Sequence, residues 1–289
     1  MTRPRPRIPT MALGDYAFAS NARDAAERAI DEHLPRVVVY SSTTAALLWP
    51  RAGVIRFDAP SAGNRPGRHG LWQRRAERRR LGEATLLLPW SEGGLAEAPT
   101  PHADAVVLGV PVEPSGPIDG ERDLAAVTYA AHAEKKGLDD VLAAWAAARG
   151  EGEDLVVVGA GAEASRTAID EGVRFEPLLR ADEYRALLRR ARLFVTAPRR
   201  EDYGIAQLEA LADGCALVTT AAPGPYAALP LARELGPRLV TDDLAPAIRT
   251  VLDEPAPGYA ARAAELLAPW RRDTLDAVVA EQVLPRLLP

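Results

Sequence analysis

The sequence predicts an α/β fold made of two doubly wound parallel sheets, one in each half of its 289 residues. Short apolar runs of strand-forming residues alternate with longer segments whose apolar residues recur at helical spacing, and Gly or Pro marks most junctions. A stretch rich in Pro and Gly, residues 110–120, separates two such series. This alternation indicates parallel strands covered by helices on both faces, and the chain is long enough for about two domains.

The first half begins with a predicted helix over residues 15–33. An Arg-rich helix is expected over 71–81, between the second and third strands of this half. Four strands are expected to form a small doubly wound sheet in this half. The predicted strands of the first half are 36–40, 53–57, 85–88 and 105–108.

The second half continues the same alternation with more elements. Its predicted strands are 125–129, 155–158, 173–175, 193–196, 216–220 and 238–241. Its predicted helices are 138–148, 181–191, 204–212, 226–235 and 244–252. We therefore predict domains over 1–112 and 121–255, followed by a helical segment, 256–289, that packs back toward the first lobe.

Composition excludes several classes of protein. With 47% hydrophobic and 26% charged residues the chain is not disordered, and a single cysteine cannot build a disulfide scaffold. No stretch approaches the roughly 18 apolar residues of a membrane span. We expect a globular protein of a reducing, cytoplasmic compartment.

Charge is uneven along the chain, with a formal +5 over the first 100 residues and −10 over the remainder. The basic half suits an anionic surface or acceptor. The Arg-rich segment 68–80 is either a solvated helix face or a peripheral contact with the inner face of a membrane. No basic stripe interleaved with aromatic residues occurs, so nucleic acid is not an expected partner.

Lysine is rare in this sequence. Of the 35 basic residues 33 are arginine, and the two lysines are the neighbours Lys135 and Lys136. Their presence reflects either an arginine-biased composition or a site that needs an ammonium group.

The segment after the predicted strand 193–196 carries the most chemical information. It contains Glu201-Asp-Tyr-Gly204 and then Glu209-Ala-Leu-Ala-Asp-Gly214. Ligands of doubly wound sheets bind at the carboxyl ends of the strands, where helix N-termini offer free N–H groups to anions. Glu201 lies in such a loop, Gly204 opens the helix without a side chain, and the Glu209 carboxylate suits two ribose hydroxyls. The alternative is a solvated helix with two exposed glutamates.

This phrase resembles the nucleotide-binding lobe of retaining GT-B glycosyltransferases of family 4, which carry two glutamates separated by seven residues, an aromatic-Gly pair and Glu-Ala-(Leu/Met)-Ala-x-Gly. The resemblance implies transfer of a sugar from a nucleotide-diphosphate sugar, UDP- or GDP-linked, to a hydroxyl acceptor with retained configuration. It implies that Glu201 orients the donor sugar and Glu209 holds the ribose. The phosphates would meet the N–H groups of Gly204, Ile205 and Ala206.

The lysines fall in a second matching phrase, His132-Ala-Glu-Lys-Lys136-Gly, which resembles the Lys-Gly helix start of the same family. The resemblance implies that Lys136 contacts the donor diphosphate, with Lys135 as its neighbour. Relatives often carry an arginine several residues earlier, which is missing here. His132, Arg199 and Arg200 are candidates for that second cation. Because no Asp-x-Asp metal signature is present, we expect a metal-independent enzyme without a cofactor.

Two further patterns bear on the donor site. Gly159-Ala-Gly161 follows a strand and Glu176 ends the next, which imitates a dinucleotide fingerprint and leaves an NAD-dependent enzyme as an alternative. The resemblance instead places the Gly159 turn against the nucleotide, and Pro177 and Leu178 beside the base.

The first lobe is less informative. Asp58 follows a strand where relatives carry polar groups near the reacting sugar, so it is a candidate catalytic residue, with a capping or turn role as the alternative. The lobe is shorter than in the family, which leaves an inactive nucleotide-sugar-binding partner as another hypothesis. The acceptor hydroxyl is not identified by the sequence.

Overall fold

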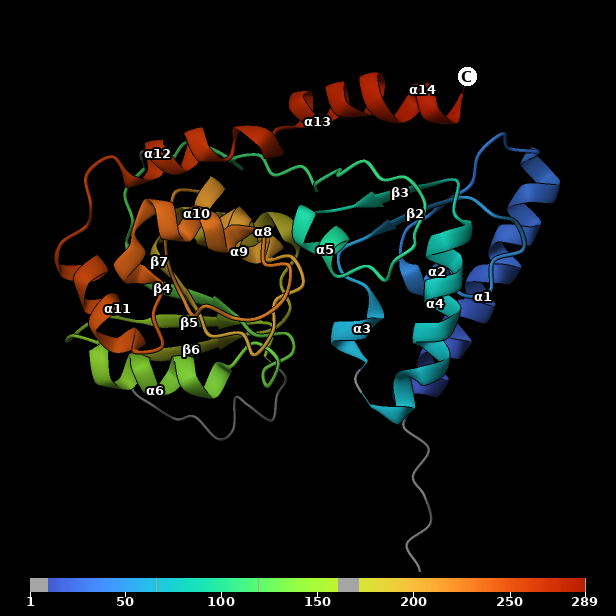
Figure 1. Cartoon of the computed structure of the whole chain (residues 1–289). Helices are drawn as coiled ribbons and strands as arrows, with labels where there is room; N and C mark the ends of the chain where they lie inside the picture. Colours follow the sequence, from blue (N-terminus) through green and yellow to red (C-terminus); the bar gives the residue numbers. More distant parts are fainter. Residues whose placement is uncertain (1–9, 66, 119, 161–171, 289) are drawn as a thin grey trace, which may run out of the picture. The chain divides into compact units, whose positions relative to one another are not determined.

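The computed structural model describes residues 10–65, 67–118, 120–160 and 172–288. The chain divides into two compact units, residues 1–109 with 276–289, and residues 110–275. The stretch 110–120 belongs to the second unit, and the last 14 residues are grouped with the first. Each unit contains its own parallel sheet (Figure 1).

Unit 1 has a three-stranded parallel sheet in the order β1-β2-β3. Its core joins the sheet to the buried sides of α1, α2 and α4, with Ile55, Phe57 and Leu87 among the fully buried side chains. The strands are β1 (Val39–Tyr40), β2 (Val54–Phe57) and β3 (Leu86–Pro89). The helices are α1 (Thr10–His33), α2 (Thr43–Ala46), α3 (Ser61–Asn64), α4 (Leu71–Glu83), α5 (Glu92–Ala96) and, at the C-terminus, α14 (Leu284–Leu287).

The predicted fourth strand of this lobe, 105–108, is wrong. Only one bridge, between Leu87 and Ala105, continues the sheet there. Leu108 N donates to Pro89 O over 2.9 Å, but Pro89 has no N–H to donate the next hydrogen bond of the ladder. A proline at the end of β3 therefore limits the ladder to a short contact.

Unit 2 has a five-stranded parallel sheet in the order β6-β5-β4-β7-β8. α6 and α11 cover one face, and α8 and α9 cover the other (Figure 1). The strands are β4 (Leu124–Tyr129), β5 (Leu155–Val158), β6 (Val173–Glu176), β7 (Ala191–Thr196) and β8 (Ala216–Thr219). The helices are α6 (Leu138–Ala148), α8 (Ala181–Arg190), α9 (Ile205–Ala212), α10 (Ala228–Leu235), α11 (Leu244–Asp253) and α12 (Tyr259–Leu266), and α13 (Arg272–Val278) crosses the boundary between the units.

The sixth strand expected over 238–241 is also absent. Residues Pro237–Leu239 form a 3-10 turn, closed by Leu239 N donating to Gly236 O over 2.8 Å. Val240 then makes a single bridge to Thr219. The proline fixes the backbone in a helical turn just where a sixth strand would start. The described fold confirms the α/β class with parallel, helix-covered sheets.

Candidate active site

The centre of the candidate site is an ion pair between two residues predicted from the sequence. Lys136 Nζ lies 2.7 Å from Glu201 Oε2, and the two side chains are only 17% and 7% exposed. Gln207 Nε2 donates to the same carboxylate oxygen over 2.9 Å. A buried carboxylate therefore sits where β4 and β7 end, held by an ammonium and an amide.

A glycine brings the two loops of this pair together. Gly137 has φ +62°, and a Cβ there would lie 1.9 Å from Ala197 O. A side chain at this position would push the loop after β4 away from the end of β7. The approach is closed by Arg199 N, which donates to Lys135 O over 2.9 Å.

The start of α9 supports the carboxylate from the other side. Gly204 has φ +91°, and a Cβ there would lie 2.9 Å from the ring of Tyr226. Tyr226 forms a hydroxyl contact of 2.9 Å with Thr219, and burial raises its pKa. Gln207 Oε1 is buried without a partner in the described part of the chain. The sequence reasoning missed Gln207, although an amide among the apolar residues of 205–212 was a usable signal.

A second cluster of charges lies beside the first in sequence and structure. Lys135 Nζ is 2.6 Å from one oxygen of Asp202, and Arg200 Nε is 2.9 Å from the other. The Lys135 side chain is 42% exposed, whereas Asp202 is buried. The sequence reasoning had proposed both cations but not the aspartate that bridges them.

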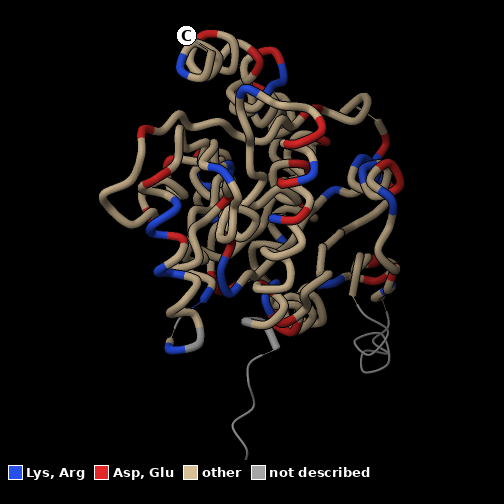
Figure 2. The backbone as a smooth tube through the Cα atoms, turned by 90° about the vertical axis from the view of Figure 1, so that its right-hand side faces the viewer, with Lys and Arg blue, Asp and Glu red and all other residues tan. Residues whose placement is uncertain are grey.

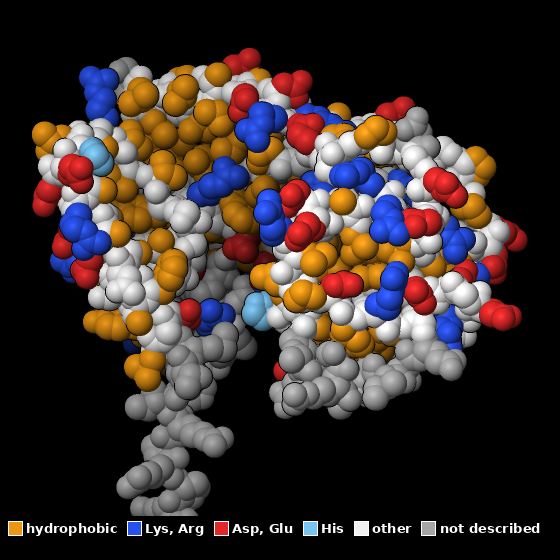
Figure 3. Space-filling view, turned by 180° about the vertical axis from the view of Figure 1, so that it is seen from behind, with side chains coloured by type: hydrophobic (Ala, Val, Ile, Leu, Met, Phe, Trp, Pro, Cys, Tyr) orange, Lys and Arg blue, Asp and Glu red, His pale blue; other side chains and the backbone are white. Residues whose placement is uncertain are grey.

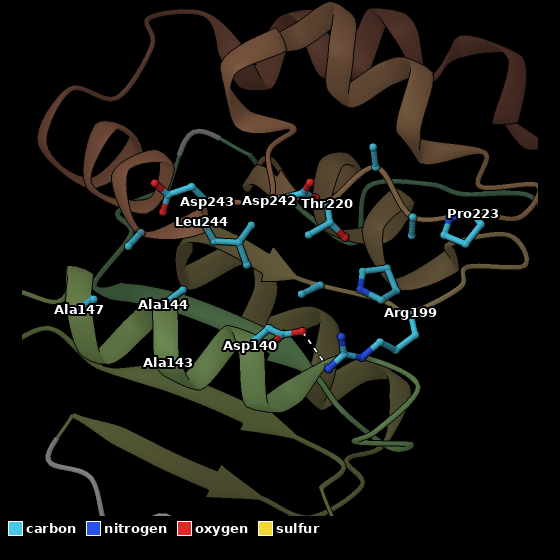
Figure 4. A pocket seen from close by; sticks show the side chains of 15 residues that line it. Asp140, Ala143, Ala144, Ala147, Arg199, Thr220, Pro223, Asp242, Asp243 and Leu244 are labelled. Carbon is cyan, nitrogen blue, oxygen red and sulfur yellow. Dashed lines mark ion pairs between the residues drawn. The ribbon is translucent and has the colours of Figure 1, made fainter.

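The other two candidates for a second cation lie differently. Arg199 pairs with Asp140 over 3.1 Å, with both side chains more than half exposed. It lines a cavity of about 670 Å³ between α6 and the loops that follow β7 and β8, which Asp242 and Asp243 also line (Figure 4). His132 is exposed, and its backbone carbonyl accepts a hydrogen bond from Lys136 N.

Glu209 lies in a separate network on α9. Arg185 Nη1 approaches its carboxylate to 3.6 Å, while Arg185 Nε holds the fully buried Asp213 at 2.6 Å. Burial of Glu209 raises its pKa. The described contacts do not link Glu209 to the pair of Lys136 and Glu201. Ile205, the first residue of α9, is exposed, and Ala206 is half-buried.

The remaining predicted donor residues lie at the carboxyl ends of β5 and β6. Gly159 has φ +82°, and its N–H donates to Glu176 O over 3.0 Å. Pro177 and Leu178 are exposed after β6. Gly161, the second glycine of the dinucleotide-like pattern, lies outside the described residues.

Two predicted features belong to unit 1. Asp58 follows β2, and its carboxylate accepts a hydrogen bond from Ala59 N over 2.7 Å, which is a turn contact. The Arg-rich segment forms a short 3-10 turn at Arg68–Gly70 and then α4. Glu77 and Leu81 face the interior, whereas Arg75 and Arg78 are exposed. In the view of Figure 2, basic and acidic residues both occur along the backbone.

Residues 122–254 match the family model of glycosyl transferases group 1. The matched residues all lie in unit 2. No curated sequence is significantly similar to the chain.

On the face shown in Figure 3, charges of both signs are interspersed over unit 2, on the right.

Solved structures show that the chain has the GT-B fold. Sucrose-phosphate synthase from Thermosynechococcus elongatus superposes with TM-score 0.66 at 15% identity, covering 99% of this chain and 80% of that one. A UDP-forming trehalose-phosphate synthase from Burkholderia xenovorans, in complex with glucose-6-phosphate, gives TM-score 0.66 at 16% identity, covering 93% and 77%. The pneumococcal O-GlcNAc transferase GtfA, in complex with UDP and GlcNAc, gives TM-score 0.61 at 12% identity, covering 86% of this chain but 54% of its own.

Among the described residues, none of the helices has the length and hydropathy needed to span a membrane. The described His, Cys, Asp and Glu side chains form no group of three or more that could hold a metal ion.

Proposed function

We propose that the chain transfers a sugar from a nucleotide-diphosphate sugar to a hydroxyl acceptor with retention of configuration. The observation that carries the proposal is the buried Lys136–Glu201 pair, with a separation of 2.7 Å, at the carboxyl edge of a group 1 glycosyltransferase domain. Two of the similar structures are described with UDP or as UDP-forming, so UDP-sugars are the first donors to test.

Lys136 supplies the positive charge that the reaction needs. As the glycosidic bond breaks, negative charge grows on the departing diphosphate, and a fixed ammonium stabilises it. Glu201 orients donor-sugar hydroxyls through its carboxylate. The free backbone N–H groups at the start of α9, at Gly204, Ile205 and Ala206, receive the phosphate oxygens.

We assign the second cation to Lys135 together with Arg200. These two positive groups share one carboxylate, that of Asp202, beside the pair of Lys136 and Glu201. Of the two, Lys135 is the more accessible to a phosphate, since its side chain is 42% exposed while that of Arg200 is 18% exposed. Positive charge from Lys135 and Arg200 near the donor phosphates supports transfer without a bound metal.

Glu209 holds the ribose in this proposal. Its carboxylate is 26% exposed and is not closed off by a tight ion pair, because Arg185 is drawn toward Asp213. Two carboxylate oxygens can accept from both ribose hydroxyls. Gly159, Pro177 and Leu178 then border the nucleotide at the neighbouring strand ends, and Asp58 remains a candidate catalytic residue of unit 1.

A donor screen followed by turnover tests the proposal. Ligand at one hundred times its Kd stabilises a folded protein by about 2.7 kcal/mol, so thermal shifts with UDP, GDP, their sugars and NAD rank the candidates. The best donor is then assayed for transfer and for the anomeric configuration of the product. Glu201→Gln and Lys136→Ala should lose activity, and Arg190→Ala, which breaks an exposed pair with Asp123, should not.

Other results would identify other functions. Donor binding without transfer to any acceptor would contradict an enzyme and favour an inactive partner. Stabilisation by NAD alone would favour a dehydrogenase. An inverted product would refute the retaining mechanism while leaving the donor site intact.

A further inference from the structure

A second cavity, of about 850 Å³, lies at the opposite edge of the unit 2 sheet from the candidate active site. It is bordered by Arg122 just before β4, by Arg192 at the start of β7 and by Ala216 at the start of β8. These are the amino ends of the strands, whereas Lys136 and Glu201 follow the carboxyl ends. The size falls within the range of about 300–1,000 Å³ typical of small-molecule sites.

The wall of this cavity is mainly apolar. Side chains and turns from α10, α11 and α12 contribute most of it, including Leu235, Leu239, Val251, Pro255 and Tyr259. The Tyr259 hydroxyl accepts a hydrogen bond from Leu217 N over 3.1 Å and keeps its O–H as a donor. A sugar placed against the apolar part of this wall would lose hydrogen bonds to water, whereas an apolar chain would gain by leaving water.

The charge at the cavity is positive. Arg122 Nη1 donates to the carbonyls of Leu188 and Ala191, and its Nη2 donates to those of Ile118 and Asp213. No carboxylate pairs with Arg122 in the described part of the chain. Its guanidinium lies so close to Gly214 that a Cβ there would be 2.4 Å from Arg122 Nη2. Carbonyl dipoles partly compensate this cation, but it has no carboxylate counter-charge, so it attracts an anion in these partly apolar surroundings.

The other charges at the cavity leave this excess in place. Arg192 is paired with Glu153 over 3.1 Å, and Arg249, which also pairs with Glu153, is compensated by Asp253. Arg238 and Glu254 are both exposed, and neither forms an ion pair with another described residue. The net charge of these lining side chains and of Glu153 is therefore +1, which matches a ligand with a single negative group.

We propose that this cavity binds an amphipathic monocarboxylate, with its hydrocarbon chain against the wall of α10, α11 and α12 and its carboxylate near Arg122 and Arg238. The proposal is independent of the sugar-transfer function, since the residues that it uses lie at the other edge of the sheet.

Titration calorimetry on the full chain with hexanoate, octanoate and decanoate tests the hydrocarbon part. Burial of each methylene contributes about 0.8 kcal/mol, so Kd should fall about fourfold per added CH₂ until the cavity is filled. Octanol, which has the same chain without the charge, should bind at least tenfold more weakly than octanoate. Equal Kd values for the three acids, or octanol binding as tightly as octanoate, would overturn the proposal.

Variants place the ligand in this cavity. Ala261→Trp fills its exposed mouth and should abolish octanoate binding, whereas Glu265→Trp, on the same helix but outside the lining, should not. Arg122→Gln should weaken octanoate but leave octanol unchanged. Because Arg122 is partly buried and that variant can fail to fold, the exposed Arg238→Gln serves as a second charge variant with the same expected pattern. Octanoate binding that survives Ala261→Trp refutes the site.

Discussion

The Lys136–Glu201 pair should contribute measurably to stability as well as to catalysis. Replacing Lys136 by Met leaves the Glu201 carboxylate, 7% exposed, with Gln207 as its remaining donor among the contacts described. Removing one partner of a buried pair costs about 3–5 kcal/mol. Since Gln207 stays in place, we expect about 3 kcal/mol for Lys136→Met.

The opposite replacement should cost less. Glu201→Gln leaves the Lys136 ammonium, whose side chain is 17% exposed, able to reach water. We expect about 1–2 kcal/mol for this change, and the double variant should be about 2 kcal/mol more stable than the sum of the single effects predicts.

Urea unfolding measures these differences. A loss of about 3 kcal/mol at a slope of about 2 kcal/mol/M lowers the midpoint by roughly 1.5 M. The fluorescence of Trp145, buried in unit 2, reports this unit, and a Trp145→Phe control identifies its signal. A loss below about 1 kcal/mol for Lys136→Met, or single effects that add within about 0.5 kcal/mol, would refute the assignment of a coupled buried pair.

Three further outcomes follow from the contacts described. Gly137→Ala should destabilise unit 2 by at least about 1–2 kcal/mol and impair donor binding, because φ is +62° and a Cβ would meet Ala197 O; a variant with wild-type Tm and donor Kd would contradict this. Nucleotide binding should weaken as pH falls through the raised pKa of Glu209, because the neutral carboxyl is a poorer acceptor, and Glu209→Gln should bind weakly at every pH in calorimetry. Burial raises the pKa of Glu77 in the folded state above its value in the unfolded chain. The stability that this carboxyl contributes is therefore fully present below the unfolded-state pKa and is lost as pH rises through the folded-state pKa. In urea titrations wild type should lose stability relative to Glu77→Gln over that pH range, and parallel curves of stability against pH would contradict this.

A vesicle assay tests the basic segment. If the Arg-rich segment 68–80 contacts a membrane, anionic vesicles should sediment the full chain, and Arg75→Gln with Arg78→Gln should reduce the bound fraction. Equal sedimentation of both proteins, or no binding to anionic vesicles, would leave α4 as a solvated face.

Periodicity was sufficient for most elements of unit 2, because β4, β5, β7 and β8 are mainly apolar and largely buried. It failed at 105–108 and 238–241, where extended apolar residues exist but Pro89 and Pro237 limit pairing. Backbone hydrogen-bond accounting, not hydrophobicity, decides whether an edge run becomes a strand.

The site was predictable in its residue types but not in its pairings. The spacing of Glu201 and Glu209 and the Lys-Gly turn indicated which residues belong to a nucleotide-sugar site. Lys136 pairs with Glu201, and Lys135 pairs with Asp202. These pairings depend on the close approach of two loops, which the contact between Gly137 and Ala197 allows. The amide among the apolar residues of 205–212 could have singled out Gln207, but its partner, the Glu201 carboxylate, is seen only in the packed structure.

The rarity of lysine has a practical consequence for labelling. The chain has only two side-chain amines, and both lie against carboxylates of the candidate site. An amine-directed reagent therefore modifies this region without competing lysines elsewhere, and the side chain that is 42% exposed should react before the one that is 17% exposed. Protection of Lys135 by a bound donor can be followed as a single mass shift, so the protein carries its own site-specific reporter.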